Sequence, residues 1–417
     1  MILDILGRLR PKAFWDWQSR SSPSHSKTDH STILRSVFCI AGGILTGTLG
    51  WCGIPQLLPV GMLFPGFWAF APSRVMGALV AGGHFLGASR GLPQGVSLFF
   101  GPQFSIGIAL WLAASSVFVA VHAALWTAKP GWQRSVRYLV AVILMAVPPF
   151  GIVGWASPIT AAGILFPAWG WLGLAITAIL LGAMTQPTWK IAVLVIAAFA
   201  TLNAATWTAS TLPSKWRGIN TTFRFDRAGQ YADYQQHLQT IEVVRKAAAS
   251  GAKHIVLPES AFGIWTPTTE RLWQQSLEHL DVTVIGGAIK LDATGYDSVL
   301  IEVSANGSKI LYRQRMPVPV SMWQPWNRLF GESEGAHATL FDNPVIEGAG
   351  YRAAPLICYE QLILWPVLQS MLYRPDTILA VGNGWWTGGS NIVAIQKASA
   401  LAWSRLFNIP LVIAFNE

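Results

Sequence analysis

A carboxylate, a thiol and an amide each follow a run of apolar residues in the second half of the chain. Glu259 comes after Ile-Val-Leu-Pro, Cys358 after Ala-Pro-Leu-Ile, and Asn383 after Leu-Ala-Val-Gly. Such runs predict buried strands, and a rigid sheet aims side chains at its strand ends into a shared cleft. A carboxylate can take the proton of a thiol nucleophile and later return it. Glu259 and Cys358 are therefore the candidate general base and nucleophile.

Cys358 is the only one of the three cysteines in the second half of the chain. Cys39 and Cys52 both lie in the apolar first half. The second half therefore offers Cys358 no partner for an intrachain disulfide. Two interpretations stay open for a single thiol of this kind, a small buried hydrophobic residue or a reactive nucleophile.

Strands and helices alternate from residue 213 onward, which is typical of a layered α/β domain. Asn306-Gly307 is a strong signal for a tight hairpin turn, and the segment 314–345 is a long loop rich in Pro and Trp. The patterns predict strands at 219–223, 254–257, 282–289, 298–303, 309–312, 352–358, 377–382 and 411–415, and helices at 234–248, 360–372 and 392–408.

The first half of the chain has a composition unlike that of a soluble enzyme. Of the 417 residues, 52% are hydrophobic and only 12% charged, whereas soluble domains carry about 25% charged residues. The formal net charge of +9 arises entirely before residue 213, and no Asp or Glu occurs from Ser36 to Ser214. Carboxylates are costly in lipid, so this composition predicts a membrane-embedded region. A chain with only three cysteines is not a disulfide scaffold. The basic balance indicates membrane loops, not nucleic-acid binding.

The uncharged windows predict about seven membrane spans, since a helix needs about 20 residues to cross. Residues 1–34 would form a basic cytoplasmic tail, 35–212 a transmembrane helical domain and 213–417 an extracytoplasmic domain. With the tail inside, eleven of the twelve Lys and Arg residues of the first half fall on the cytoplasmic side, and only Arg90 falls outside. The windows that carry the predicted spans are 36–73, which fits two, 75–89, 103–126, 138–155, 163–184 and 191–214.

Four motifs in the second half resemble those of the nitrilase, or carbon–nitrogen hydrolase, superfamily. They are Leu-Pro-Glu-Ser-Ala (257–261), Gly-Tyr-Asp-Ser-Val-Leu (295–300), Ile-Cys-Tyr-Glu (357–360) and Asn-Gly-Trp-Trp (383–386). A domain of this kind after a polytopic membrane domain resembles apolipoprotein N-acyltransferases, and also conjugal transfer proteins of rhizobial and agrobacterial plasmids. The resemblance implies a four-layer α-β-β-α sandwich.

The resemblance also implies a chemistry. Cys358 would form a thioester with a phospholipid acyl chain, Glu259 would act as the base, and the acyl group would pass to an amine. Tyr359, Glu360, Asn383 and Trp386 would support the site. No cofactor or metal is implied. The implied partners are the phospholipid bilayer, a phospholipid acyl donor and a lipoprotein or a protein of the conjugation machinery, at the bacterial inner membrane with the second domain in the periplasm.

One motif departs from the family. In the stretch 312–322, Gln314 occupies the position of the catalytic lysine, and Met322 replaces a second glutamate. Arg313 or Arg315 could supply the missing cation, although on an alternating strand both would point away from the face of Gln314. Glu332 or Glu334 could stand in for the lost glutamate. Three alternatives stay open: an acyltransferase, a weakened or inactive scaffold of conjugation, and an amidase with water as acceptor.

Overall fold

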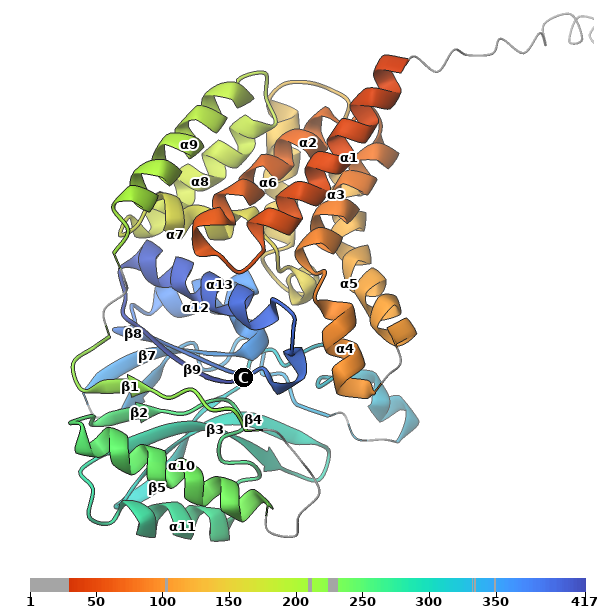
Figure 1. Cartoon of the computed structure of the whole chain (residues 1–417). Helices are drawn as coiled ribbons and strands as arrows, with labels where there is room; N and C mark the ends of the chain where they lie inside the picture. Colours follow the sequence, from red (N-terminus) through yellow and green to blue (C-terminus); the bar gives the residue numbers. More distant parts are fainter. Residues whose placement is uncertain are drawn as a thin grey trace, which may run out of the picture.

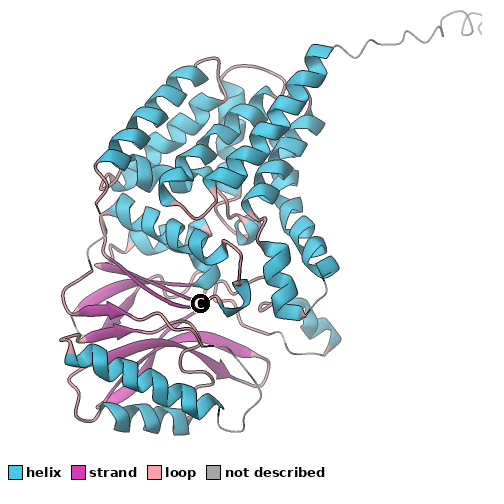
Figure 2. Cartoon of the chain, viewed as in Figure 1, coloured by secondary structure: helices cyan, strands magenta, loops and turns pink. Residues whose placement is uncertain are grey.

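The computed structural model describes residues 30–101, 104–208, 212–223, 232–331, 333, 335–348 and 350–417. An N-terminal helical half lies against a C-terminal α/β half (Figures 1 and 2). Most of the predicted basic tail, 1–34, falls outside the described residues, and the first helix begins at His30.

The helical half consists of α-helices joined by short 3₁₀ segments. Pro55, Pro59 and Pro65 lie within the second apolar stretch, which is 3₁₀ over η1 and α-helical only over α2. The elements are α1 (His30–Gly50), η1 (Pro55–Leu63), α2 (Phe64–Phe70), α3 (Arg74–Ala88), α4 (Leu92–Phe100), α5 (Phe104–Leu125), α6 (Trp132–Leu144), η2 (Phe150–Val153), η3 (Pro158–Ala161), α7 (Ala162–Leu165), α8 (Gly170–Met184) and α9 (Trp189–Ala205).

Arg90 stabilises the end of the helical half that faces the α/β half. Its Nη1 donates to the carbonyl oxygens of Thr48 and Gly87, each at 3.0 Å. These carbonyls belong to the last turns of α1 and α3, where helices leave backbone acceptors unsatisfied and favour a cation. Arg90, the one basic residue of the first half that the positive-inside rule placed outside the cytoplasm, therefore caps two helices.

The count of seven spans is not confirmed. Among the described residues, α1 and α5 are long and apolar enough to cross a membrane, and α8 and α9 are shorter apolar helices. The window composition does not reveal that prolines break some of these stretches into short pieces.

Two sheets pack face to face in the α/β half. The first has the order β1-β2-β3-β4-β5 and the second β6-β7-β8-β9. Apolar side chains from both sheets, among them Leu300 and Leu379, form one buried cluster between them. The strands are β1 (Trp216–Gly218), β2 (His254–Val256), β3 (Thr283–Leu291), β4 (Tyr296–Ser304), β5 (Gly307–Arg313), β6 (Ile346–Gly348), β7 (Tyr351–Ile357), β8 (Thr377–Asn383) and β9 (Leu411–Asn416).

Helices cover the outer faces of both sheets, which gives the implied α-β-β-α sandwich (Figure 1). The helices α10 (Ala232–Ala249) and α11 (Pro267–Leu277) pack on the first sheet, through side chains such as Trp273. The helices α12 (Leu364–Leu372) and α13 (Ile392–Phe407) cover the second, and α13 also contacts the helical half. Trp403 of α13 shares one apolar core with residues of α7 and α8.

Most predicted elements of the α/β half are confirmed. The hairpin around Asn306-Gly307 joins β4 to β5 as expected. The first predicted strand, 219–223, is wrong, because β1 ends at Gly218 and only Thr221 forms an isolated bridge beyond it. The helix predicted at 360–372 begins at Leu364, after the 3₁₀ turn η5 (Cys358–Gln361), and both α11 and β6 were missed.

Candidate active site

The two candidate reactive residues lie in tight turns at strand ends. Glu259 follows β2, and Cys358 follows β7. Cys358 has φ +49° and Ser260, next to Glu259, has φ +64°. Residues other than Gly rarely adopt this left-handed backbone conformation, which costs about 1–3 kcal/mol for each residue. It persists only where the surrounding structure holds the backbone in place. The turns are therefore positions where packing fixes the direction of the side chain.

The Cys358 thiol and the Glu259 carboxyl group form a hydrogen bond. Both residues are almost fully buried, at 5% and 6% exposure. Burial raises the pKa of Glu259 to about 7, against the opposing effect of the bonds from the thiol and from the Asn383 backbone. Burial, followed by the charge of Glu259, raises the pKa of Cys358 well above its ordinary value. The resting thiol is therefore neutral and lies beside a carboxyl group that titrates near neutral pH.

Gly287 of β3 allows the turn that carries Glu259 to lie against the sheet. A Cβ atom at this position would come within 2.6 Å of the Glu259 Cα and of the Ser260 nitrogen. Both are backbone atoms, so neither could rotate away. The position of Glu259 thus depends on the glycine at position 287 of the neighbouring strand, which has no side chain.

Gln314, at the position of the family lysine, is fully buried but contacts backbone rather than sulfur. Its Nε2 donates to the carbonyl oxygen of Ile357 at 3.2 Å, and its Oε1 has no hydrogen-bond partner. Ile357 immediately precedes Cys358, so this amide holds the turn of the thiol. It supplies no positive charge.

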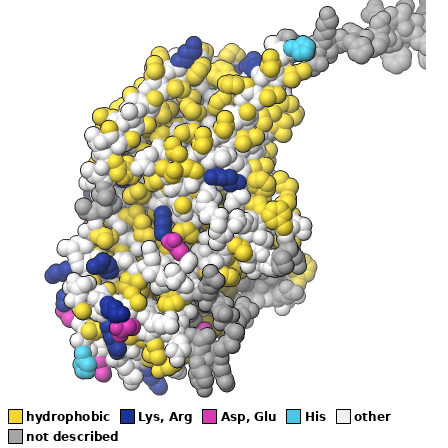
Figure 3. Space-filling view, in the orientation of Figure 1, with side chains coloured by type: hydrophobic (Ala, Val, Ile, Leu, Met, Phe, Trp, Pro, Cys, Tyr) yellow, Lys and Arg dark blue, Asp and Glu magenta, His cyan; other side chains and the backbone are white. Residues whose placement is uncertain are grey.

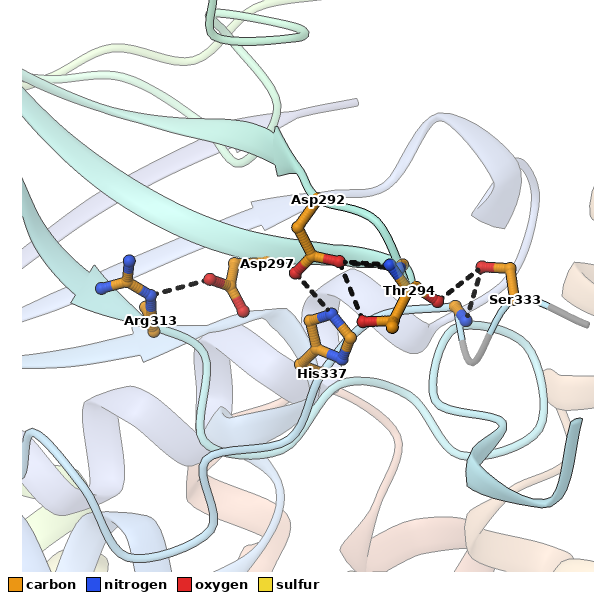
Figure 4. Close-up of polar contacts among 8 residues, drawn as sticks. Asp292, Thr294, Asp297, Arg313, Ser333 and His337 are labelled. Atoms are coloured by element: carbon orange, nitrogen blue, oxygen red, sulfur yellow. Dashed lines mark hydrogen bonds and ion pairs between the residues drawn. The ribbon is translucent and has the colours of Figure 1, made fainter. Parts of the chain in front are cut away.

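The two arginines that flank Gln314 differ in burial and in hydrogen-bond partners. Arg313 ends β5 and forms an exposed ion pair with Asp297, with Nε 2.7 Å from the carboxylate (Figure 4). Arg315 is fully buried, and its guanidinium donates to the Pro366 and Pro355 carbonyls at 2.9 and 3.2 Å. Because β5 stops at Arg313, the expected alternation does not continue, and Arg315 turns inward toward α12. The partners of these two guanidinium groups are Asp297 for Arg313, and Tyr312 and groups of β7 and α12 for Arg315, so neither bonds to the thiol.

Glu360 holds the loop after β5 against the turn of Cys358. Its Oε1 accepts from the Tyr312 hydroxyl and the Arg315 nitrogen, each at 2.7 Å, and from Met316 at 3.1 Å. Its Oε2 accepts from the Ile357 nitrogen at 2.8 Å. Burial raises the pKa of Glu360, while the charge of Arg315 and these donors oppose the rise. Its four bonds make Glu360 a positioning residue.

The remaining predicted support residues surround the pair. The Tyr359 hydroxyl donates to the Ile152 carbonyl at 2.8 Å, which ties the nucleophile turn to the helical half. The Asn383 side chain accepts from Asn416 at 3.0 Å, and its backbone bonds to both Glu259 and Cys358. Trp386 donates to the Asn383 carbonyl at 3.0 Å.

A cavity of about 720 Å³ joins this site to the helical half. Glu259 and Cys358 line one part of it, and apolar residues of α3, α4 and α5 line another. Glu259 is the only Asp, Glu, Lys or Arg among the described lining residues. The apolar lining residues from the helical half are Ala88, Leu92, Val96, Phe99, Leu110, Ala113, Ala114, Val153 and Trp155.

Comparison with known proteins places the chain in a family. The model of the carbon-nitrogen hydrolase family matches residues 103–405. The chain belongs to the carbon-nitrogen hydrolase family. It is 53% identical over 374 residues to the "Probable conjugal transfer protein TraB" of Sinorhizobium fredii, covering 89% of this chain and 96% of that protein. It is 49% identical over 426 residues to the "Conjugal transfer protein TraB" of Agrobacterium fabrum, covering both chains completely.

Part of the chain is also similar to solved structures. A variant of the Nesterenkonia AN1 amidase from the nitrilase superfamily matches at 11% identity and a TM-score of 0.35, covering 48% of this chain and 74% of that one. The family inferred from the motifs is confirmed by the family model and the conjugal transfer relatives.

Met322, which stands at the position of the second family glutamate, lines the cavity. Glu332 and Glu334, the suggested substitutes, lie outside the described residues. In the described ranges no group of three or more His, Cys, Asp and Glu side chains is arranged to hold a metal ion.

The long loop that follows β5 is tied to the β3–β4 turn (Figure 4). Asp292 accepts from the nitrogens of Thr294 and Gly295 at 2.7 and 2.9 Å, and lies 2.8 Å from His337 Nε2. These bonds hold the pKa of Asp292 well below its usual range. His337 donates its backbone nitrogen to the Tyr296 carbonyl, and the Tyr296 side chain lines the cavity. The loop is thereby fixed beside the site.

Sequence reasoning missed one contact in the site. Gln396 of α13 donates Nε2 to the Cys358 sulfur at 3.4 Å. The signal was a polar residue on the buried face of a helix, next to Ile395 and one turn from Ser399, both also buried. The pattern predicts burial of that face, but not which side chain of a distant turn it meets.

Proposed function

We propose that this chain is a membrane-bound, thiol-dependent acyltransferase that forms a thioester at Cys358. The observation that carries the proposal is the cavity, which connects the Cys358–Glu259 pair to apolar walls from α3, α4 and α5. A cavity of about 720 Å³ falls within the usual range for ligand sites. Its apolar lining suits a hydrocarbon chain, with the reactive carbonyl at the polar end.

The chemistry starts with the proton of the thiol. As Cys358 Sγ attacks the carbonyl carbon of an acyl ester, its proton passes to Glu259. The ester C–O bond then breaks, and Glu259 returns the proton to the departing alcohol. In the second half, an amine attacks the thioester, its proton passes to Glu259, and the C–S bond breaks with return of the proton to sulfur. A base with a pKa of about 7 suits both directions of this transfer.

A phospholipid is the acyl donor in this proposal because the helical half has an apolar exterior. Large apolar side chains are exposed along its helices, including Leu34, Ile179 and Leu194 at 67–70% exposure. On the face shown in Figure 3, hydrophobic side chains are spread over this half together with a few Lys and Arg, and the acidic groups lie on the α/β half. An exposed apolar surface of this extent is costly in water and favourable in lipid.

The proposed topology has about seven passes, a cytoplasmic N-terminus and a periplasmic α/β half. The ends of the helical half support it. Arg35 donates to the Phe70 carbonyl and Arg134 lies over the Phe70 ring, so these bases gather at one end. Arg90 caps α1 and α3 at the other end, next to the cavity. The exposed Leu329 and Phe330, at the tip of the long loop, would meet the lipid surface.

Reporter fusions test the topology. A phosphatase that folds only outside the cytoplasm should be active when fused after Lys215 and silent when fused after Arg137. The opposite pattern would show that the number of passes has the wrong parity.

An acyl-transfer assay tests the activity. The purified chain, in vesicles with a phospholipid labelled in its acyl chain, should transfer label to an added lipopeptide amine. The Cys358→Ser variant should not. Release of free fatty acid alone would favour an amidase-type or esterase-type reaction with water as acceptor.

A second candidate function is favoured by Gln314. The family's cation is replaced here by a neutral amide that contacts backbone. If the site is inactive, the chain would serve as a membrane scaffold of plasmid conjugation, as the names of its relatives suggest. Wild-type conjugation in the Cys358→Ala variant would favour the scaffold.

A further inference from the structure

An active thiol in this site needs a group that stabilises its anion, and the flanking cations do not supply one. Arg313 is paired with Asp297 at the surface. Arg315 is held by carbonyl oxygens of β7 and α12. Gln314 donates its side-chain amide to the Ile357 carbonyl, not to the sulfur.

Gln396 is the side chain that does contact the sulfur. Its Nε2 lies 3.4 Å from Cys358 Sγ, and the residue is only 4% exposed. The amide nitrogen is the donor, so the sulfur accepts this bond through a lone pair and keeps its own proton available for Glu259. The two contacts to the thiol come from different segments. Glu259 lies in the turn after β2, and Gln396 lies in α13.

Helix α13 is held firmly enough to aim this amide. Ser399, one turn further along the same face, donates to the Gln361 carbonyl at 2.6 Å, directly behind the nucleophile turn. Ile392 and Ile395 of the same helix line the cavity, and α13 also packs against α7. The amide is therefore fixed between the helical half and the thiol.

We propose that Gln396 is a catalytic residue, whose amide donor stabilises the Cys358 thiolate in place of the cation that the family has at position 314. The proposal rests on the proposed role of Cys358 as nucleophile. When the proton moves from sulfur to Glu259, the existing bond from Gln396 becomes a charge-assisted one, which is about twice as strong as a neutral bond. Nothing has to reorganise, because the donor is in place before the charge develops.

Thiol reactivity tests this without any acyl substrate. In the full-length chain with Cys39→Ala and Cys52→Ala, Cys358 is the sole thiol, and the cavity admits a small alkylating reagent. The rate of alkylation by iodoacetamide is measured against pH. Gln396→Met keeps the length of the side chain and removes the donor. It should shift the profile upward by about one pH unit, a roughly tenfold slower reaction at pH 7.5.

Two further variants make the test decisive. Gln396→Glu, nearly the same shape, replaces the donor by a negative charge and should slow alkylation more than Gln396→Met. Lys397→Met removes a cation one residue along α13, where it pairs with Glu417, and should leave the profile unchanged. Profiles of both Gln396 variants within twofold of the parent would overturn the proposal. A shifted profile with no acyl transfer would leave the role of Gln396 standing while the proposed acyl substrate failed.

Discussion

Gln314 donates its side-chain amide to the carbonyl of Ile357, the residue before the nucleophile, at 3.2 Å. The side chain at the family's lysine position therefore acts on the backbone of the thiol turn. Its buried Oε1 is left without a partner. This one bond explains how the turn stays in position without the cation, and why the thiol must be activated by other groups.

Variants of Gln314 separate these two roles. Gln314→Lys should keep a donor to the Ile357 carbonyl and add a charge near the thiol, so it should lower the Cys358 pKa and speed adduct formation, by roughly tenfold. Gln314→Ala leaves a buried carbonyl without its donor, at a cost of about 1–3 kcal/mol, and should nearly abolish the adduct. Alkylation kinetics and thermal unfolding measure both. Equal behaviour of both variants and the wild type would remove this position from the site.

The two neighbouring arginines should respond in opposite ways. Arg315→Ala removes a buried guanidinium with bonds to Tyr312, Gln369 and Ser370, and should destabilise the fold by about 3 kcal/mol or more. Arg313→Ala breaks one exposed ion pair and should cost at most about 1 kcal/mol, with unchanged thiol reactivity. Thermal melting and alkylation decide the matter. Loss of reactivity in a stably folded Arg313→Ala protein would give that arginine the catalytic cation's role.

The raised pKa of Glu259 predicts a pH-dependent stability. Burial lifts this pKa from 4.5 to about 7, so the folded chain holds the proton more tightly than the unfolded chain does. The stabilisation is full below about pH 4.5 and is lost as the pH rises through 7. The loss amounts to about 3 kcal/mol. Glu259→Gln, always neutral, should lack it. Unfolding free energies of the two proteins that run parallel from pH 4.5 to 8 would contradict the burial of an ionising Glu259.

Gly287 should be irreplaceable. A Cβ there meets the backbone of Glu259 at 2.6 Å, so Gly287→Val should displace the base and destabilise the chain by about 1–3 kcal/mol. The alkylation profile of Cys358 should then lose the influence of a group titrating near pH 7. Gly82→Ala is the control, because a Cβ at Gly82 in α3 meets only Val119, at 3.6 Å. If Gly287→Val retained the wild-type profile and stability, the close approach of β3 to Glu259 would be unimportant.

The sequence predicted the parts of this site that depend on local pattern. Glu259 and Cys358 could be chosen because each follows a buried strand and lies in a motif of known spacing. The structure brings the two together across the sandwich.

The rest depended on contacts between distant segments. Arg315 turned inward because β5 ends two residues earlier, and no alternation pattern marks where a strand stops. Gln396 reaches the thiol only because α13 packs behind the turn of Cys358. The span count rested on windows of apolar composition, which do not record how Pro55, Pro59 and Pro65 divide a stretch into 3₁₀ and α-helical pieces.

The most direct test of the central claim is the mass of the peptide that contains Cys358, after incubation of the full-length chain in vesicles with a phospholipid of one defined acyl chain and no amine acceptor. The proposed mechanism predicts that this peptide gains the mass of the corresponding fatty acid less one water. The adduct should be removable by hydroxylamine and absent in Cys358→Ser and strongly reduced in Glu259→Gln. An unmodified Cys358 peptide from a folded, membrane-embedded protein, even after Gln314→Lys, would contradict the mechanism and favour the scaffold.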